Sequence, residues 1–307
     1  MNATNSFSTD FSEPNEIARF TTWDLDFRQI EAGSGTTHVS VRGGQLLSTL
    51  WIEMPYKVHQ LGAAPPNVLT FGLPRPRLLT NWLRSEAPDL PLVCFGAGRE
   101  FDGVSEAGFE ALTVNIGREA FEALARDFGV ELPGNADVPA VIDLLSKPKI
   151  ADLVVRNARV FVDGGSDHLG SEDEEDLALA LLIATSGTAA KAVCGASRMR
   201  DRVLQRALDV IEAKTDSPPS IRELCVLCDT SWPTLDRAFL ERFGVSPKAY
   251  LMALRLNRVR QELASRDFKG KVADAANRWG FWHMGQFAKD YRKFFKRLPS
   301  EELHHRL

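Results

Sequence analysis

The sequence is poor in the features that mark secreted and membrane-spanning proteins. Only four cysteines occur in 307 residues, and two of them share a predicted helix, so a reducing compartment is favoured over a disulfide framework. No run approaches the roughly 18 consecutive apolar residues that span a bilayer. Residues 1–10 are polar and do not resemble an export signal. We therefore expect a cytoplasmic protein with no membrane partner.

Motifs of catalysis and of metal or cofactor binding are also missing. The sequence contains no Gly-x-Gly-x-x-Gly, phosphate-binding loop or nucleophile elbow. His38 and His59 are isolated, whereas a metal-dependent β-barrel enzyme needs closely spaced histidines and a carboxylate. Cys225 and Cys228 have the spacing of half a zinc site, but no second pair follows, so we interpret them as core thiols. We expect no enzyme activity, no cofactor and no metal.

The charges are distributed unevenly along the chain. Residues 1–199 contain 16 Lys and Arg against 27 Asp and Glu, a net charge of −11, although the whole chain has a net charge of only −4. Residues 200–307 contain 21 basic against 14 acidic residues, a net charge of +7. A basic C-terminal region joined to an acidic remainder is typical of proteins that bind a phosphate backbone.

The last hundred residues contain the same pattern twice. A short helix predicted at 221–228 leads through a tight turn to a helix at 234–243, and a helix at 272–279 leads to another that runs through 287–295. Ile221 and Val272 are 51 residues apart, while Phe243 and Phe295 are 52 apart, so the second copy has one extra residue in its turn. Two helices joined by a short turn form a helix-turn-helix, whose second helix enters the DNA major groove.

The two copies differ at residues that end their helices. Gly244 of the first copy corresponds to Lys296 of the second, and Asp229 corresponds to Gly280. Glycine suits a left-handed helix end, and Asp tolerates this conformation far better than Lys. We therefore expect the segment after Phe295 to close differently or to carry strain.

The N-terminal region changes from strand-like to helical patterns. Segments rich in β-branched and aromatic residues lie at 37–42, 46–52, 67–72 and 92–95, which is typical of a small antiparallel sandwich or barrel. Helices are predicted at 118–128 and 139–146, and over the apolar stretch 177–183 after the acidic run 172–176. Residues 184–199 have no apolar period. We expect a linker there, between a β-rich domain at 1–183 and a DNA-binding domain at 200–307.

Several motifs of the C-terminal domain occur in a specific order. They lie at 231–250, 254–260, 279–283, 287–292 and 299–300. With these motifs, residues 202–303 resemble the AraC/XylS family of bacterial transcriptional regulators. The resemblance implies an all-α domain of about seven helices, with helix-turn-helix units at about 221–243 and 272–295 joined by a long helix at about 247–265. It also implies an α+β chain whose β-rich, cupin-like N-terminal domain binds an effector or forms dimers.

The residues at helical spacing divide into an inward and an outward set. The apolar set predicted to form the core is Leu224, Ala238, Phe239, Phe243, Ala275, Ala276, Phe287, Tyr291 and Phe295. The outward set, predicted to reach DNA, is Trp232, Pro233, Asp236 and Arg237 in the first unit and Trp282, His283, Met284, Gln286 and Lys289 in the second. Predicted phosphate contacts are Arg292, Lys293, Lys296 and Arg297. Asp236 either accepts from cytosine, orients Arg237 or is merely solvated.

The N-terminal domain has weaker signals. Trp51, Tyr56, His59 and Arg99 are candidate pocket residues, each at least as compatible with ordinary packing. We expect an effector-responsive transcription activator with promoter DNA, RNA polymerase, an unidentified small molecule and a second copy of the chain as partners. Two alternatives remain open. One is a DNA-binding protein whose N-terminal region only oligomerises, and the other is an enzyme fused to a DNA-binding domain.

Overall fold

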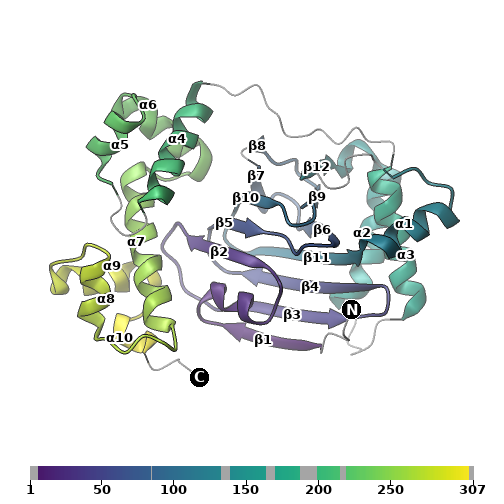
Figure 1. Ribbon diagram of the computed structural model, residues 1–307, viewed down its shortest axis with the longest axis horizontal. Helices are drawn as coiled ribbons and strands as arrows, with labels where there is room; N and C mark the ends of the chain where they lie inside the picture. Colours follow the sequence, from purple (N-terminus) through teal and green to yellow (C-terminus); the bar gives the residue numbers. More distant parts are fainter. Residues whose placement is uncertain are drawn as a thin grey trace. The chain divides into compact units, whose positions relative to one another are not determined.

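The chain divides into two units (Figure 1). The computed structural model describes residues 6–83, 85–132, 139–163, 170–186, 199–214 and 219–303. The first unit extends to residue 194 but omits 27–35 and 55–59, which group with residues 195–307 in the second unit. In the described ranges, no helix is long and apolar enough to cross a membrane.

Two antiparallel sheets contain the strands of the first unit, and residues 27–29 of β2 and 58–59 of β5 group with the second unit. The seven-stranded sheet has the order β1 (Phe7–Phe11), β3 (Thr37–Gly43), β4 (Leu47–Met54), β11 (Phe109–Gly117), β6 (Val68–Pro74), β9 (Pro91–Cys94) and β12 (Ala140–Asp143). The five-stranded sheet has the order β2 (Asp24–Gln29), β5 (Val58–Ala63), β10 (Glu100–Ser105), β7 (Leu79–Trp82) and β8 (Ser85–Glu86). A 3-10 turn, η1 (Pro14–Arg19), follows β1. The β-rich N-terminal region predicted from the sequence is confirmed.

The helix predicted at 139–146 is wrong. Residues Ala140–Asp143 form β12, which pairs with β9 from Ala140 opposite Cys94 to Asp143 opposite Pro91. The Asp143 side chain then accepts a hydrogen bond from the Leu145 backbone and begins the 3-10 turn η2 (Leu144–Ser146). The β-branched pair Val141 and Ile142 suits a strand, and a short apolar run does not by itself distinguish strand from helix.

Three helices cover one face of the seven-stranded sheet. They are α1 (Arg118–Asp127), α2 (Pro148–Asp163) and α3 (Ser171–Thr185), and their apolar sides join the strands in one continuous core (Figure 1). The acidic run forms the first turn of α3, where carboxylates favour the positive end of the helix dipole. One of them, Glu174, is buried and accepts hydrogen bonds from the backbone N–H groups of Gln45, Leu46 and Leu47.

A cluster of aromatic rings forms a second apolar centre in the first unit. Trp82 packs against Phe95 and Phe101, with ring centroids 4.8 and 5.6 Å away, and these two rings also contact each other at 5.2 Å. Trp23 packs edge-on against Phe95 and Phe101. Aromatic pairs in such tilted geometries add to the free energy gained by burying their surface.

The C-terminal residues of the second unit form seven helices in the part that the structure describes. They are α4 (Met199–Ala213), α5 (Ile221–Leu227), α6 (Trp232–Phe243), α7 (Pro247–Ala264), α8 (Val272–Arg278), α9 (Met284–Phe295) and α10 (Pro299–Glu302). Ser220 and Glu223 form a capping box at the start of α5. Hydrogen bonds from the Ser220 backbone and side chain lower the pKa of Glu223. Helix α6 begins two residues earlier than expected because Pro233 is preorganised for a first helical turn.

The second unit also contains two segments from the N-terminal part of the chain. Within it, Gln29 exchanges backbone hydrogen bonds with the Asn257 side chain of α7, at 3.2 and 2.8 Å. His59 Nδ1 lies 2.8 Å from Tyr250 Oη, and both residues are buried. Most of the expected linker, residues 187–198, lies outside the described residues, so the domain boundaries remain a prediction.

Candidate nucleic-acid interface

Buried aromatic residues hold the first helix-turn-helix unit together. Leu224 of α5 is fully buried, as are Phe239 and Phe243 of α6. The Phe239 and Phe243 rings pack on Tyr250 of α7 at centroid distances of 5.3 and 4.7 Å. The tight turn between α5 and α6 contains Asp229 at φ 49°, a conformation that Asp tolerates. One face of α6 is thereby fixed to the domain, and the opposite face is free to contact a ligand.

The outward face of α6 carries the predicted DNA-contacting residues of the first helix-turn-helix unit. Trp232 is 43% exposed, Pro233 and Arg237 are also exposed, and Asp236 is half-buried. At the start of the helix, the hydroxyl groups of Ser231 and Thr234 lie 2.9 Å apart. A helix N-terminus with hydroxyl groups attracts phosphate oxygens, so these two residues extend the predicted interface. The Ser-x-x-Thr spacing is the signal that identifies them.

The second helix-turn-helix unit repeats this arrangement. Ala275 and Ala276 of α8 and Phe287, Tyr291 and Phe295 of α9 share one core. On the outward side Trp282 is 73% exposed, and His283, Gln286 and Lys289 are exposed as well. The Gln286 amide donates a 2.9 Å hydrogen bond to Asp290, which orients it on the helix surface. Met284 differs from its neighbours because it is half-buried and packs against the core.

The two units close in the same way, so the expectation of a different ending after Phe295 is wrong. Gly244 caps α6 at φ 74° and Lys296 caps α9 at φ 60°, both left-handed. Each cap donates its backbone N–H to the helix, Gly244 to Leu240 and Lys296 to Arg292. Lys296 adopts the geometry of glycine despite its Cβ, and the strain expected for a non-glycine residue in this conformation remains.

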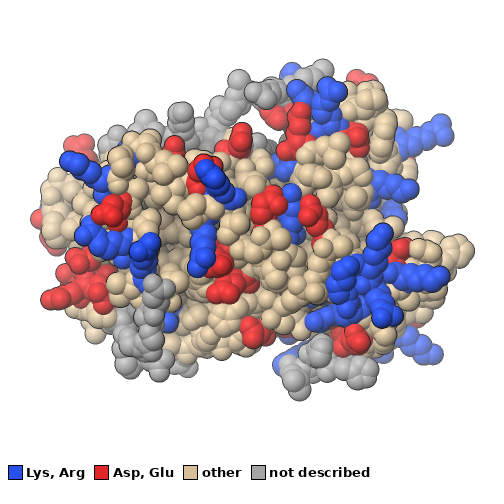
Figure 2. All heavy atoms as spheres, turned by 180° about the vertical axis from the view of Figure 1, so that it is seen from behind, with Lys and Arg blue, Asp and Glu red and all other residues tan. Residues whose placement is uncertain are grey.

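The predicted phosphate contacts fall into two groups. Arg292, Lys293 and Lys296 are exposed at the end of α9. Arg297 is instead half-buried, and its guanidinium lies 3.7 Å from Glu302 of α10, a buried carboxylate that also accepts a 3.1 Å hydrogen bond from Tyr291. Arg297 therefore tethers α10 and is less available to DNA. Figure 2 shows Lys and Arg side chains gathered over the C-terminal helices on the face that it presents.

The four candidate effector residues divide between the two units. Trp51 lies on β4 and lines a cleft of the first unit, and its Nε1 donates a 2.8 Å hydrogen bond to Glu53. Arg99 is exposed beside β10. Tyr56 and His59 are buried and belong to the second unit, where His59 bonds to Tyr250. The sequence could not reveal this separation, because residues 55–59 follow a strand of the first unit directly.

Cys225 of α5 and Cys228, which follows the helix, differ in exposure. Cys228 is buried and Cys225 is partly exposed, and neither forms a disulfide. Burial raises the pKa of the Cys228 thiol, which disfavours the thiolate that a metal requires. In the described ranges no three His, Cys, Asp or Glu side chains are grouped closely enough to hold a metal ion.

Comparison with known proteins places the similarity in the C-terminal domain. A family model described as a helix-turn-helix domain matches residues 225–304. The probable thc operon regulatory protein of Rhodococcus erythropolis is 30% identical over 102 residues, which are 33% of this chain and 31% of that protein. The XylDLEGF operon transcriptional activator 3 of Pseudomonas putida is 31% identical over 103 residues, again 33% and 31% of the two chains. The matched region thus spans about a third of the length of these curated relatives.

A solved structure is similar to about a third of the chain. It is a transcriptional regulator with an AraC-type DNA-binding domain from Chromobacterium violaceum, with 30% identity over 34% of this chain and 91% of that chain, and a TM-score of 0.32. The Rhodococcus and Pseudomonas relatives are named as a regulator and an activator of operons and not as enzymes. The family model and the curated relatives, together with the two helix-turn-helix units described above, identify residues 225–304 as a helix-turn-helix domain of the AraC/XylS type that transcriptional regulators contain.

Proposed function

We propose that the chain is a sequence-specific transcription regulator that binds double-stranded promoter DNA. Helices α6 and α9 enter successive segments of the major groove, and Trp232, Pro233, Asp236, Arg237, Trp282, His283, Gln286 and Lys289 face the DNA. Met284 contributes through its exposed part. Arg292, Lys293 and Lys296 neutralise phosphates beside the second helix, which increases affinity without reading the sequence.

One observation carries this proposal. Two helix pairs bury equivalent aromatic residues, close with the same left-handed cap, and leave the polar side of their second helix exposed. A buried inner face makes each outer face rigid, so a few side chains are held at fixed spacing toward base edges. The net charge of +7 of residues 200–307 supplies long-range attraction to DNA.

The role of the N-terminal region completes the proposal. It binds a small-molecule effector and sets promoter occupancy, and the chain acts in the cytoplasm as an activator that contacts RNA polymerase, as a dimer. The relatives named as operon activators support activation over repression. If the N-terminal region only oligomerises, no small molecule will raise the melting temperature of the folded chain, whereas an effector that binds the folded state must raise it.

Selection from randomised duplex DNA tests the DNA-binding step. The full chain should enrich a bipartite sequence whose two elements lie about one helical turn, or 10 base pairs, apart. Its affinity for the enriched duplex should exceed that for random duplex by at least 10³-fold at physiological salt. Equal affinity for both duplexes, measured by fluorescence anisotropy, would reject sequence-specific binding.

A further inference from the structure

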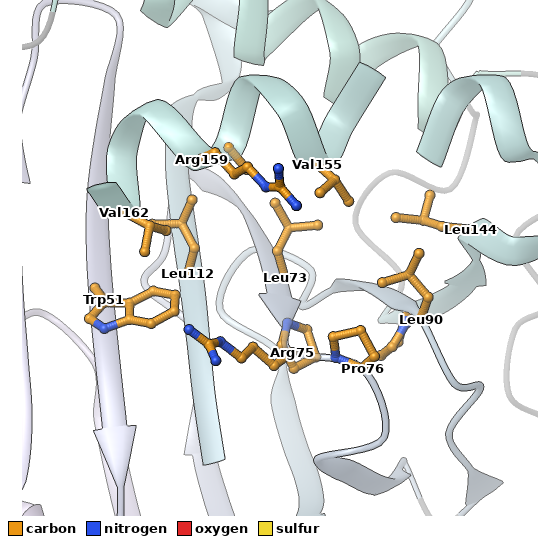
Figure 3. Close-up of a pocket in the computed structure, with 13 residues that line it drawn as sticks. Trp51, Leu73, Arg75, Pro76, Leu90, Leu112, Leu144, Val155, Arg159 and Val162 are labelled. Carbon is orange, nitrogen blue, oxygen red and sulfur yellow. The ribbon is translucent and has the colours of Figure 1, made fainter. Parts of the chain in front are cut away.

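A cleft on the first unit lies between the seven-stranded sheet and helix α2 (Figure 3). Its volume is about 380 Å³, which lies at the small end of the range for ligand pockets, about 300–1,000 Å³. The lining residues come from β4, β6, β11, the start of β9, η2 and α2. The loop residues Arg75, Pro76 and Leu90 complete the lining, and all of the lining residues belong to the first unit.

The floor of the cleft is set by strand register. Leu112 of β11 lies directly opposite Trp51 of β4 on one side and Leu73 of β6 on the other. Residues paired across neighbouring strands point to the same face of a sheet, so these three side chains form a continuous apolar row beneath α2. Leu112 is 1% exposed, whereas Trp51 and Leu73 are half-buried. The row leaves apolar surface open to a small ligand.

The remaining walls are apolar as well. Val155, Ala158 and Val162 descend from α2, and Leu90 and Leu144 close one end of the cleft (Figure 3). The backbone N–H of Leu144 donates a 3.0 Å hydrogen bond to the Leu90 carbonyl, which fixes this end. Rigid apolar walls lower the entropy that is lost when a ligand binds.

Among the described residues that line the cleft, only Arg75 and Arg159 are ionisable. Arg159 extends from α2 into the cleft, and Arg75 extends along the opposite rim toward Trp51 (Figure 3). Arg75 Nε lies 2.8 Å from Glu110, so this guanidinium is already partly neutralised. Arg159 has neither an ion pair nor a hydrogen bond within the described part of the chain. Because Arg159 is exposed, it can turn toward a bound group at little cost.

We infer that this cleft binds a small carboxylic acid whose apolar body lies on the Trp51–Leu112–Leu73 row and whose carboxylate pairs with Arg159. A guanidinium binds a carboxylate through two parallel hydrogen bonds, which fix the orientation of the bound acid. Arg75 adds a second positive charge across the rim. The role of this cleft as an effector site rests on the proposed function. Binding of an apolar acid in the cleft can be tested without it.

Binding of two probes to the purified full chain tests the inference. Decanoate and 4-phenylbutyrate each combine an apolar body with one carboxylate, and their amides have nearly the same shape without the charge. Isothermal titration should detect binding of at least one acid, with its amide bound at least tenfold more weakly. Arg159→Gln should weaken binding of the acid roughly tenfold to a hundredfold, as expected for a lost hydrogen-bonded charge pair.

Helix α2 supplies a matched control. Arg156 lies one turn before Arg159, pairs with Asp152 at 3.0 Å, and does not line the cleft. Arg156→Gln removes the same charge from the same helix, so it should leave binding of the acid unchanged. Circular dichroism verifies that both variants fold.

Three outcomes would overturn the inference: neither acid binds, an amide binds as tightly as its acid, or the two arginine variants behave alike. Sequence-specific DNA binding, measured on the same samples without probe, reports on the proposed function independently. If the full chain recognises a DNA sequence but its binding of the acid does not depend on Arg159, the proposed ligand site is rejected and the proposed function stands. If the acid binds in an Arg159-dependent way but the chain does not recognise a DNA sequence, the proposed regulator function is rejected and the ligand site stands.

Discussion

Gly244 and Lys296 occupy equivalent positions in the two helix-turn-helix units and share a left-handed backbone, with φ of 74° and 60°. For Gly244 this conformation carries no steric penalty, whereas the Cβ of Lys296 approaches the following carbonyl oxygen. The retained lysine is an exposed cation beside the predicted phosphate-contacting residues. In the second helix-turn-helix unit, Lys296 thus lowers the stability of the fold and adds a positive charge for the proposed DNA contact.

Lys296→Gly should separate these two effects. We expect the free energy of unfolding to rise by up to about 1 kcal/mol, because glycine removes the left-handed strain. The salt dependence of DNA affinity should fall by about one phosphate contact. Urea denaturation and anisotropy at several salt concentrations measure the two quantities. Lys293→Ala is the control, since it removes a neighbouring charge without changing a left-handed residue; a Lys296→Gly protein less stable than the parent would contradict the strain argument.

Arg237 and Lys289 should each read a different half of the DNA site. Both are exposed, Arg237 on α6 and Lys289 on α9. Alanine at either position should cost about 1–3 kcal/mol on the selected duplex and relax base preference in one half only. Repeating the duplex selection with each variant identifies the half concerned. Equal losses on selected and random duplexes would instead assign these side chains to the phosphate backbone.

Tyr250 and His59 form a buried polar contact within the second unit, at 2.8 Å. Tyr250→Phe keeps the ring that stacks on Phe243 but removes the hydroxyl group. We expect the free energy of unfolding to fall by about 1 kcal/mol, because the hydrogen bond is lost and His59 is left without this partner. The melting temperature should fall by roughly 2–4 °C. Combined with His59→Phe, the two losses should be less than additive. Fully additive losses would mean that the two residues act independently.

Glu174 holds the turn between β3 and β4 through three backbone N–H groups. Glu174→Gln replaces one acceptor oxygen with an NH₂ group that faces these donors. We expect a loss of about 1.5–3 kcal/mol in the free energy of unfolding of the first unit, as for a buried hydrogen bond to a charged group. Its exposed neighbour Glu175 offers the control, and Glu175→Gln should stay within about 0.5 kcal/mol. Similar losses in both variants would assign the effect to net charge.

The parts of the fold that are predictable from the sequence depend on local patterns. The helix pairs repeat with a spacing of 51 to 52 residues, and every apolar position assigned to their core is buried, because helical periodicity is a local property. Glu174 lies in a run of carboxylates that looks solvated. Its burial depends on a strand turn about 130 residues earlier, a separation that no local pattern reveals.

The candidate sites divide in the same way. The outward residues of α6 and α9 follow from helix periodicity, although the packing of Met284 and the tie from Arg297 to Glu302 depend on tertiary contacts. The cleft was not predictable, since its floor requires the register of three strands and its cation lies on α2, a helix without a recognised signal. Only Trp51 among its residues was identified from the sequence.

Cys94 should react slowly with alkylating reagents in the folded chain. Burial raises the pKa of its thiol from 9.0 to about 12, so the thiol stays neutral at pH 8, and the reactive thiolate appears only as the pH approaches 12. Cys94 and Cys225 are both half-buried as whole residues, so Cys225 serves as an internal comparison of similar overall accessibility. Iodoacetamide labelling at pH 8, followed by peptide mass spectrometry, should modify Cys94 more slowly than Cys225, because less of the Cys94 thiol is ionised. In 6 M urea the difference should disappear, because unfolding removes the burial that suppresses ionisation; equal rates in the folded chain would show that β9 opens readily.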